Sequence, residues 1–292
     1  LYNAAGEDFM PRYGLSSSNA RKGPLSRAIT SEIAAGRGTP HGGVYYDMTM
    51  LPRDMIVQGH SIFYVPAKAA GLDITQVPAE MAPASHTFMG GVEAEADTST
   101  GVAGLFVCGE AMGGLHGADR IGGNAGAEVL VFGGQAGRSA AAYLTQNAQT
   151  VSGTQFQDAV RAFEARHAGY LSRTSGTPVS ELRARLMKLM DRHVGILRDE
   201  AGLLTALSGL DRLESAFADA CSGGGSGVRS LYEFSNMLLL GRMQVMASFL
   251  RTESRGVFNR TDHPDRDDSA WKKNIVFHLK NGRPVPVVRD CK

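Results

Sequence analysis

The segments His86-Thr-Phe-Met-Gly-Gly91 and Gly114-Leu-His-Gly-Ala-Asp-Arg-Ile-Gly-Gly-Asn124 place a histidine and an arginine beside clustered glycines. Glycine allows positive φ angles and lets the backbone approach a ligand closely. Histidine and arginine supply donors that bind and polarise carboxylates. Alone, His86 would more often be structural and Arg120 could equally be an ion-pair partner, but the adjacent glycines favour a site. The pattern suits a small anionic substrate held against a large, flat cofactor.

Composition excludes several other classes of function. The 292 residues suggest one to three domains, and the net charge of +1 shows no bias toward nucleic acid or an anionic membrane. The three cysteines are far apart, so they build neither a zinc cage nor an iron–sulfur cluster, and no metal site is predicted. A reducing, cytoplasmic location is expected. No run approaches the roughly 18 apolar residues of a membrane span.

The first eighty residues predict a mixture of helices and a strand. The stretch before Pro24 is polar and mobile in character. From Pro24 to Ala35 apolar residues recur at helical spacing, and Gly36-Arg-Gly38 ends that helix. Val44-Tyr-Tyr-Asp-Met48 predicts a short strand, and the stretch from Leu51 to Gly71 predicts another helix that ends at Gly71.

The two motifs lie within a segment of strands and one helix. Gly91–Ala96 and Gly104–Cys108 predict strands separated by a turn at Asp97-Thr-Ser-Thr-Gly101. Small and apolar residues between Ala125 and Leu144 predict a buried helix in close contact with a ligand or a sheet. Asn124 is expected to cap this helix, whose free backbone amides would stabilise negative charge in front of them.

After Gln146 the sequence becomes helical in character. Apolar residues at helical intervals predict an antiparallel bundle in which Ser222-Gly-Gly-Gly-Ser-Gly227 separates the third helix from the fourth. The four predicted helices are Gln155–Leu171, Val179–Met190, Ala201–Ala220 and Ser230–Leu250. In the remaining tail, a loop at 262–268 and a strand at Asn274–Leu279 are expected.

Two further features could carry chemistry. Gly109-Glu110 follows an apolar strand, where a carboxylate could hydrogen-bond a nucleotide or ribityl hydroxyl, although an ordinary turn with an exposed glutamate fits equally well. Among the other histidines only His116 is a site candidate, because it lies within the second motif.

Taken together, these motifs resemble the C-terminal half of the FAD-dependent flavoprotein family of succinate dehydrogenase, fumarate reductase and L-aspartate oxidase. Their order and density make the likeness more specific than any single glycine-rich loop. It continues through a helical domain and a tail. The segments that carry it are His86–Gly91, Gly104–Glu110, Leu115–Asn124, Glu128–Gly133, Val194–Gly202, Glu253–Gly256 and Pro264–Asp268.

The resemblance implies an FAD-dependent oxidoreductase that exchanges hydride between flavin N5 and a carbon flanked by carboxylates. It implies that His86 and Arg120 bind substrate carboxylates, providing the charge and hydrogen bonds that such a transition state requires. It also implies that Glu110, with Gly109 before it, holds the ribityl or ribose region of FAD. Three residues would present backbone toward the isoalloxazine, namely Asn124, Ala125 and Gly126.

The chain departs from the family at two positions. Aligning Ser26-Arg-Ala-Ile29 on the family's Ser-Arg-Asp-x-x-Ser-Arg-Ala-Ile segment places Lys22 where the family has its proton-donating arginine. A compact ammonium cannot reproduce a planar, bidentate guanidinium, although it can act as an acid. Lys22 could instead be a solvated charge, and Arg21 could take the role after a shift of one residue. Phe258 stands where many relatives carry a histidine.

The largest departure is that no Gly-x-Gly-x-x-Gly opens a βαβ unit. We therefore expect either a fragment or a subunit whose site a separate N-terminal chain completes. The predicted fold is an α/β (α+β) flavoprotein portion, with a capping-domain remnant and a partial Rossmann-like FAD domain before the helical bundle. The expected boundaries are 1–80 for the capping part, 81–147 for the FAD part, 148–255 for the helical domain and 256–292 for a tail packed on the FAD part.

The substrate and the partners stay open at this stage. A small dicarboxylate is expected, and the alternatives are an amino-acid oxidase, an adenylylsulfate reductase-like enzyme, or a noncatalytic flavin-binding or assembly module. For electron transfer, the resemblance implies either an iron–sulfur subunit as a partner, with peripheral attachment to the inner membrane through it, or the oxygen, fumarate or attached haem domains that soluble members of the family use. No nucleic-acid partner is expected.

Overall fold

The computed structural model describes residues 1–16, 18–147, 153–222 and 227–291. It divides into two compact units, Leu1–His86 and Thr87–Lys292. Part of the predicted glycine linker, residues 223–226, lies outside the described residues.

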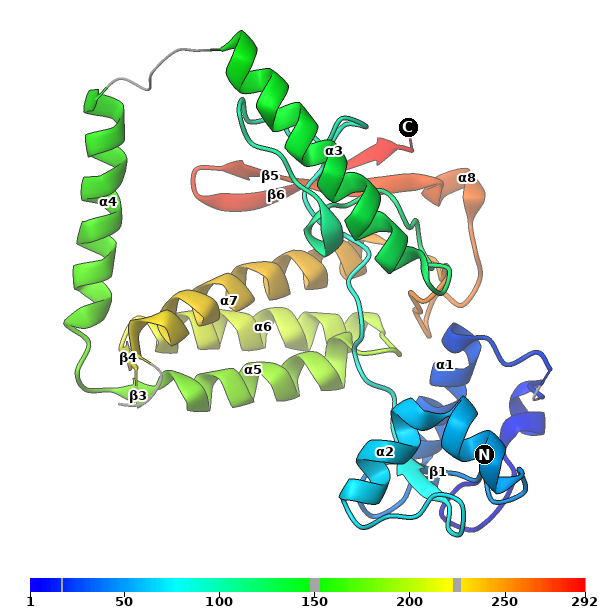
Figure 1. The fold of residues 1–292 in the computed structure, drawn as a ribbon. Coiled ribbons are helices and arrows are strands. Elements are labelled where there is room, and N and C mark those ends of the chain that lie inside the picture. The colour runs from blue at the N-terminus through cyan, green and yellow to red at the C-terminus, as the bar shows by residue number, and fades with distance from the viewer. Residues whose placement is uncertain (17, 148–152, 223–226, 292) are drawn as a thin grey trace. The chain divides into compact units, whose positions relative to one another are not determined.

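The first unit combines short helices with one two-stranded sheet (Figure 1). Strands β1 (Val44–Tyr46) and β2 (Ala79–Met81) pair antiparallel, with Val44 opposite Met81. The helical elements are the 3₁₀ turn η1 (Met10–Tyr13), α1 (Lys22–Glu32), the π-helical turns η2 (Ile33–Arg37) and η3 (Met55–Gly59), and α2 (Ser61–Ala69). The predicted helices and strand are confirmed, and Gly36 ends the first helix at a φ of 74°.

The polar N-terminal stretch is more ordered than the sequence indicates. Phe9 is buried against Ala28 and Ile29 of α1. Asn3 is also buried, and its amide nitrogen donates hydrogen bonds to Glu7 and Glu32. The interpretation of this stretch as mobile is therefore wrong. The Phe9 ring and the buried Asn3 amide both join it to α1.

The second unit begins with an irregular segment. The strands predicted at Gly91–Ala96 and Gly104–Cys108 are wrong, because each segment contributes only a single bridging residue, in the pairs Val92–Met112 and Ser99–Phe106. A strand needs a neighbour along its length to satisfy its backbone groups, and within the described residues each of these segments has a bridge partner at one residue only. The turn between them is confirmed, with the amide of Thr98 donating to Glu95 O at 2.8 Å.

Helix α3 (Asn124–Gln146) follows the 3₁₀ turn η4 (Gly109–Ala111) and covers the predicted helix. The expectation that it is buried is wrong for the described chain, in which Glu128 is its only buried residue and Leu130 is 78% exposed. Its small and apolar side chains therefore present an open surface in the structure.

Three helices of the second unit form the predicted bundle. Helices α5 (Val179–Val194), α6 (Glu200–Phe217) and α7 (Gly227–Leu250) lie side by side, and each runs antiparallel to the one before it (Figure 1). Their shared core contains Leu182, Leu203, Leu210, Leu231 and Val245 among others, all essentially inaccessible to water. Burial of such an apolar core is the main source of the bundle's stability.

The first of the four predicted helices, α4 (Gly153–Leu171), packs on α7 through aromatic rings. The Phe163 and Tyr232 rings stack with centroids 6.2 Å apart, and Tyr170 meets Tyr232 edge-on at 4.7 Å. A short parallel pair, β3 (Thr177–Pro178) and β4 (Ala220–Cys221), joins the start of α5 to the end of α6.

The tail ends in a hairpin of which the sequence predicts one strand. The short helix α8 (Asp268–Trp271) precedes β5 (Lys273–Lys280), which confirms the expected strand, and β6 (Arg283–Asp290) pairs with it antiparallel. The missed strand had a signal, since Asn281-Gly282 is a dipeptide typical of tight hairpin turns. Both residues adopt positive φ angles, 51° and 74°.

Candidate functional site

The loop that carries Arg120 lies against the first motif. The backbone amide of Arg120 donates to Met89 Sδ at 3.1 Å, so the two quoted segments meet in space. The guanidinium makes only a long contact with Ile121 O, at 3.4 Å, and no carboxylate lies within ion-pair distance of it among the residues described. Arg120 is therefore available to bind an anion.

Glu110 also contacts the first motif. One of its carboxylate oxygens accepts a hydrogen bond from the Phe88 amide at 2.9 Å, which fixes the first motif to the end of the 104–110 segment. Next to it, Gly91 packs so closely that a Cβ would stand 2.3 Å from Ala111 O. No larger residue fits there without displacing backbone, which explains the second glycine of the Gly90-Gly91 pair.

His116 belongs to a buried pair that the sequence did not reveal. Its Nε2 lies 2.7 Å from Glu128 Oε2, and both side chains are nearly inaccessible to water. The other oxygen, Glu128 Oε1, is buried and has no hydrogen-bond partner in the described part of the chain. The pair ties the second motif to the first turns of α3. Its only signal was a glutamate at the start of a helix made of small and apolar residues.

The start of α3 differs from the expectation in one respect. Gly123, not Asn124, occupies the cap position, with a φ of 87°, and no side chain caps the helix. A glycine stands there because the chain turns through the left-handed region, which a residue with a Cβ adopts only with strain. No atom lies within 4 Å of the position that a Cβ would occupy at Gly122, Gly123 or Gly126. The helix start is therefore bare backbone facing open space.

The remaining candidates belong to the first unit. His86, its last residue, is exposed. Arg21 and Lys22 are also exposed, at the cap and first position of α1. The first turn of α1 contains no acidic residue, and no ion pair of Lys22 is found among the described residues. Two cations at a helix N-terminus reinforce its positive end and favour anions nearby.

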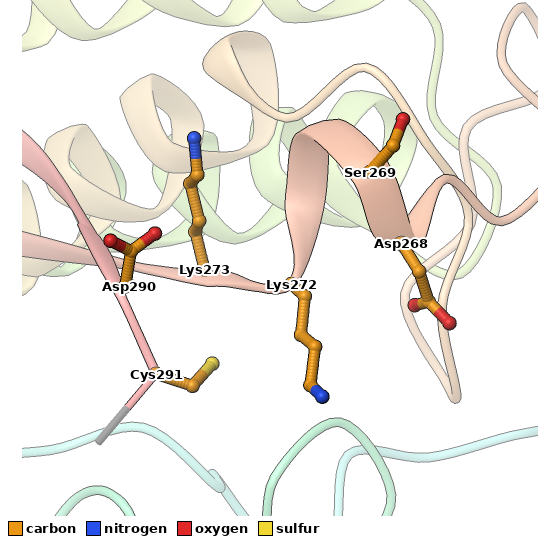
Figure 2. A pocket seen from close by; sticks show the side chains of 6 residues that line it. All are labelled: Asp268, Ser269, Lys272, Lys273, Asp290 and Cys291. Atoms are coloured by element: carbon orange, nitrogen blue, oxygen red, sulfur yellow. The ribbon is translucent and has the colours of Figure 1, made fainter.

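A cavity in the tail is lined by none of these residues. It has a volume of about 340 Å³ and is lined by Asp268, Ser269, Lys272, Lys273, Asp290 and Cys291. Figure 2 shows the Lys272 and Lys273 side chains extending in opposite directions. Its charged groups do not converge on one point, so it is not part of the candidate site.

Comparisons with known proteins identify the family. Residues 183–288 match the family described as fumarate reductase flavoprotein C-term, and residues 1–125 match the FAD binding domain family. The chain is 35% identical over 284 residues to a fumarate reductase (CoM/CoB) subunit of Methanothermobacter marburgensis, covering 96% of this chain and 51% of that protein. This chain belongs to the fumarate reductase and succinate dehydrogenase flavoprotein family. It spans about half the length of the curated relatives it matches.

Solved structures give the same result for the fold. Over its whole length the chain resembles Mycobacterium smegmatis Sdh1 in complex with UQ1, at 34% identity and a TM-score of 0.84, covering 50% of that chain. It also resembles a quinol-fumarate reductase chain, at 25% identity and a TM-score of 0.89, covering 55% of that chain. The predicted family, fold class and FAD cofactor are thereby confirmed. No helix within the described ranges is long and apolar enough to cross a membrane.

Proposed function

We propose that the flavoprotein containing this chain transfers hydride between FAD and a small dicarboxylate of the succinate and fumarate type. One observation carries the proposal. Arg120 presents a guanidinium with no carboxylate partner in the described residues, on a loop fixed at Met89, close in sequence to the bare start of α3. Such a guanidinium suits bidentate binding of a carboxylate.

The residues present fit FAD. Glu110 uses one oxygen for the Phe88 amide, which leaves its second oxygen to hold a ribityl or ribose hydroxyl. At α3, the backbone of Asn124, Ala125 and Gly126 lies at the helix's positive end, where negative charge on a flavin edge is stabilised. When bound, FAD supplies hydride exchange at N5. His116, with its buried partner Glu128, would support the loop beside it.

This chain's own residues would orient the substrate and move a proton. Arg120 and His86 are proposed to bind carboxylates, so that the reacting carbon is held in one position. Lys22, or Arg21 after a shift of one residue, is proposed to hold the proton that is exchanged with the substrate carbon. Their position at the N-terminus of α1 supports the assignment, because both charges are exposed there.

The family membership also supports a domain assignment and partners. The proposed parts are capping (1–80), FAD-binding (81–147), helical (148–255) and tail (256–292). Contacts support packing of the tail on the FAD part, since Val257 N donates to Ala118 O at 3.1 Å and Arg289 pairs with Glu93 at 3.1 Å. An N-terminal half, on the same or a separate chain, and an iron–sulfur electron-transfer subunit complete the proposal. The location would be cytoplasmic, with peripheral membrane association through that subunit.

The test is Arg120→Ala in the complete flavoprotein. We expect fumarate reduction or succinate oxidation to fall at least about 100-fold, because a charge-assisted carboxylate contact is lost in the transition state. Bound flavin should stay at the wild-type level. Arg192→Ala, at an exposed position on α5, serves as the control and should retain wild-type turnover. Wild-type turnover in Arg120→Ala would refute the role of this residue.

The same assays separate the alternatives. A noncatalytic flavin module would bind flavin and show no turnover with any of a panel of dicarboxylates. An amino-acid oxidase would oxidise aspartate but not succinate. Either result would overturn the proposal for succinate or fumarate while leaving FAD binding intact.

A further inference from the structure

The C-terminal segment touches the loop of Arg120 at one point. Val257 N donates to Ala118 O at 3.1 Å, two residues before Arg120. The preceding Gly256 has a φ of 59°, and a Cβ there would stand 2.2 Å from Ala118 O and 2.9 Å from Ala118 Cβ. Because real Cβ contacts lie beyond about 3 Å, only glycine allows the two backbones to approach this closely.

The turn that contains Gly256 is held firmly. Arg255 and Phe258 exchange two backbone hydrogen bonds, each of 2.9 Å. Behind them, the fully buried Glu253 accepts from Arg255 Nε at 2.7 Å and Nη2 at 3.0 Å, from Arg251 Nη1 at 2.5 Å and from the Asp267 amide at 2.9 Å. A buried carboxylate with this many donors has little freedom to reorient.

The same segment is anchored to the helical bundle. Buried Arg260 donates to the carbonyls of Ser248, Phe249 and Arg251 at 2.8–3.2 Å, which caps the end of α7. The Phe258 ring lies under the Arg198 guanidinium, 4.9 Å from the ring centroid, in the connection between α5 and α6. This contact gives the aromatic side chain at position 258 a defined partner, since a ring face attracts a cation.

We infer that the turn Arg255–Phe258 is a positioning element for Arg120, which transmits the rigidity of the bundle to the carboxylate-binding loop through Gly256 and Ala118. The inference deepens the proposed function and rests on it for the role of Arg120. In this arrangement Gly256 acts on Arg120 through the Ala118 backbone. Gly256 determines the position of the loop backbone from which Arg120 would reach the substrate.

The experiment is Gly256→Ala in the complete flavoprotein. The new methyl group must move the Ala118 backbone by about 1 Å to reach an ordinary contact distance, and misplacement of that size can change transition-state binding by about 100-fold. We expect the Kd of malonate, followed by the change in flavin absorbance, to rise about 10- to 100-fold while flavin stays bound. Hydrogen exchange of the amides in 115–123 should quicken.

Gly282→Ala is the matched control. Gly282 also has a positive φ, 74°, but no atom lies within 4 Å of where its Cβ would stand. The substitution brings similar backbone strain without contact with Ala118, so malonate affinity and exchange in 115–123 should keep their wild-type values.

A second variant decides the case if Gly256→Ala does not fold. Glu253→Gln removes the charge that holds Arg255 without adding bulk. It should raise the Kd of malonate and the exchange rate in 115–123 by smaller factors than Gly256→Ala. Wild-type exchange in 115–123 together with wild-type malonate affinity, in whichever of the two variants folds, would overturn the inference. If the wild-type protein binds no dicarboxylate, the proposed function fails, and the exchange measurement alone then decides whether the turn positions the loop.

Discussion

Glu32 offers the sharpest test of what stabilises the first unit. Its carboxylate is fully buried and accepts from Arg37 Nε and Nη2, both at 2.8 Å, from Arg12 Nη1 at 2.9 Å and from Tyr13 Oη at 2.8 Å. Glu32→Gln keeps the side-chain volume but removes the charge. The NH₂ group of the new amide would also face the donor groups that now surround the carboxylate. Removing one member of a buried ion pair costs about 3–5 kcal/mol. Arg12 and Arg37 are partly exposed and can rehydrate, so we expect about 2–4 kcal/mol.

The effect should depend on pH with a defined sign. The two hydrogen bonds from Arg37 hold the pKa of Glu32 far below its ordinary value of 4.5, against the opposing effect of burial. A group whose pKa is lower in the folded state stabilises that state fully above the unfolded pKa, and this stabilisation is lost as the pH falls. The difference between wild type and Glu32→Gln should therefore be constant near neutral pH and shrink steadily below about pH 4.5.

The assay is hydrogen exchange of the α1 amides, corrected for the intrinsic exchange rate at each pH. A loss of 2–4 kcal/mol corresponds to roughly 30- to 1000-fold lower protection. Glu7→Gln is the control, because Glu7 pairs with the same Arg12 at 3.2 Å but is exposed, and exposed pairs contribute about 0–1 kcal/mol. Equal effects of the two substitutions, or a difference that grows as the pH falls, would refute the reasoning.

Two further predictions concern the second unit. Leu203→Ala should destabilise the bundle by about 2–5 kcal/mol in urea unfolding, because it empties a fully buried position, whereas Leu204→Ala at a half-exposed neighbour should cost much less. An equal shift of both unfolding midpoints would contradict the assigned core. Glu128→Leu should lower the free energy of unfolding by about 1–3 kcal/mol, because it leaves the buried His116 without its partner. Glu128→Gln should lower it less, because it keeps an acceptor. The reverse order in urea unfolding would show that the pair does not stabilise the loop.

Much of the fold could be predicted from local patterns. Helices α5 to α7 follow the apolar periodicity because packing on neighbouring helices requires one apolar face, and Gly36 ends the first unit's helix as expected. The strands predicted at 91–96 and 104–108 failed, since a strand depends on a neighbour that no local pattern supplies. The second strand of the hairpin was missed although Asn281-Gly282 indicated its turn.

The sequence by itself determined the family and the residue types of the proposed site: the glycines, His86 and Arg120 within the two opening motifs, and the lysine at position 22. These are local properties, because the backbone freedom of a glycine and the charge of a guanidinium belong to the residue itself and not to the fold. Only the tertiary structure decided that Arg120 is fixed at Met89, that His116 faces Glu128, and that Gly256 presses on Ala118. The reason is physical: such contacts join positions up to 138 residues apart in the sequence, and their energy depends on distances and burial that exist only once the chain has folded.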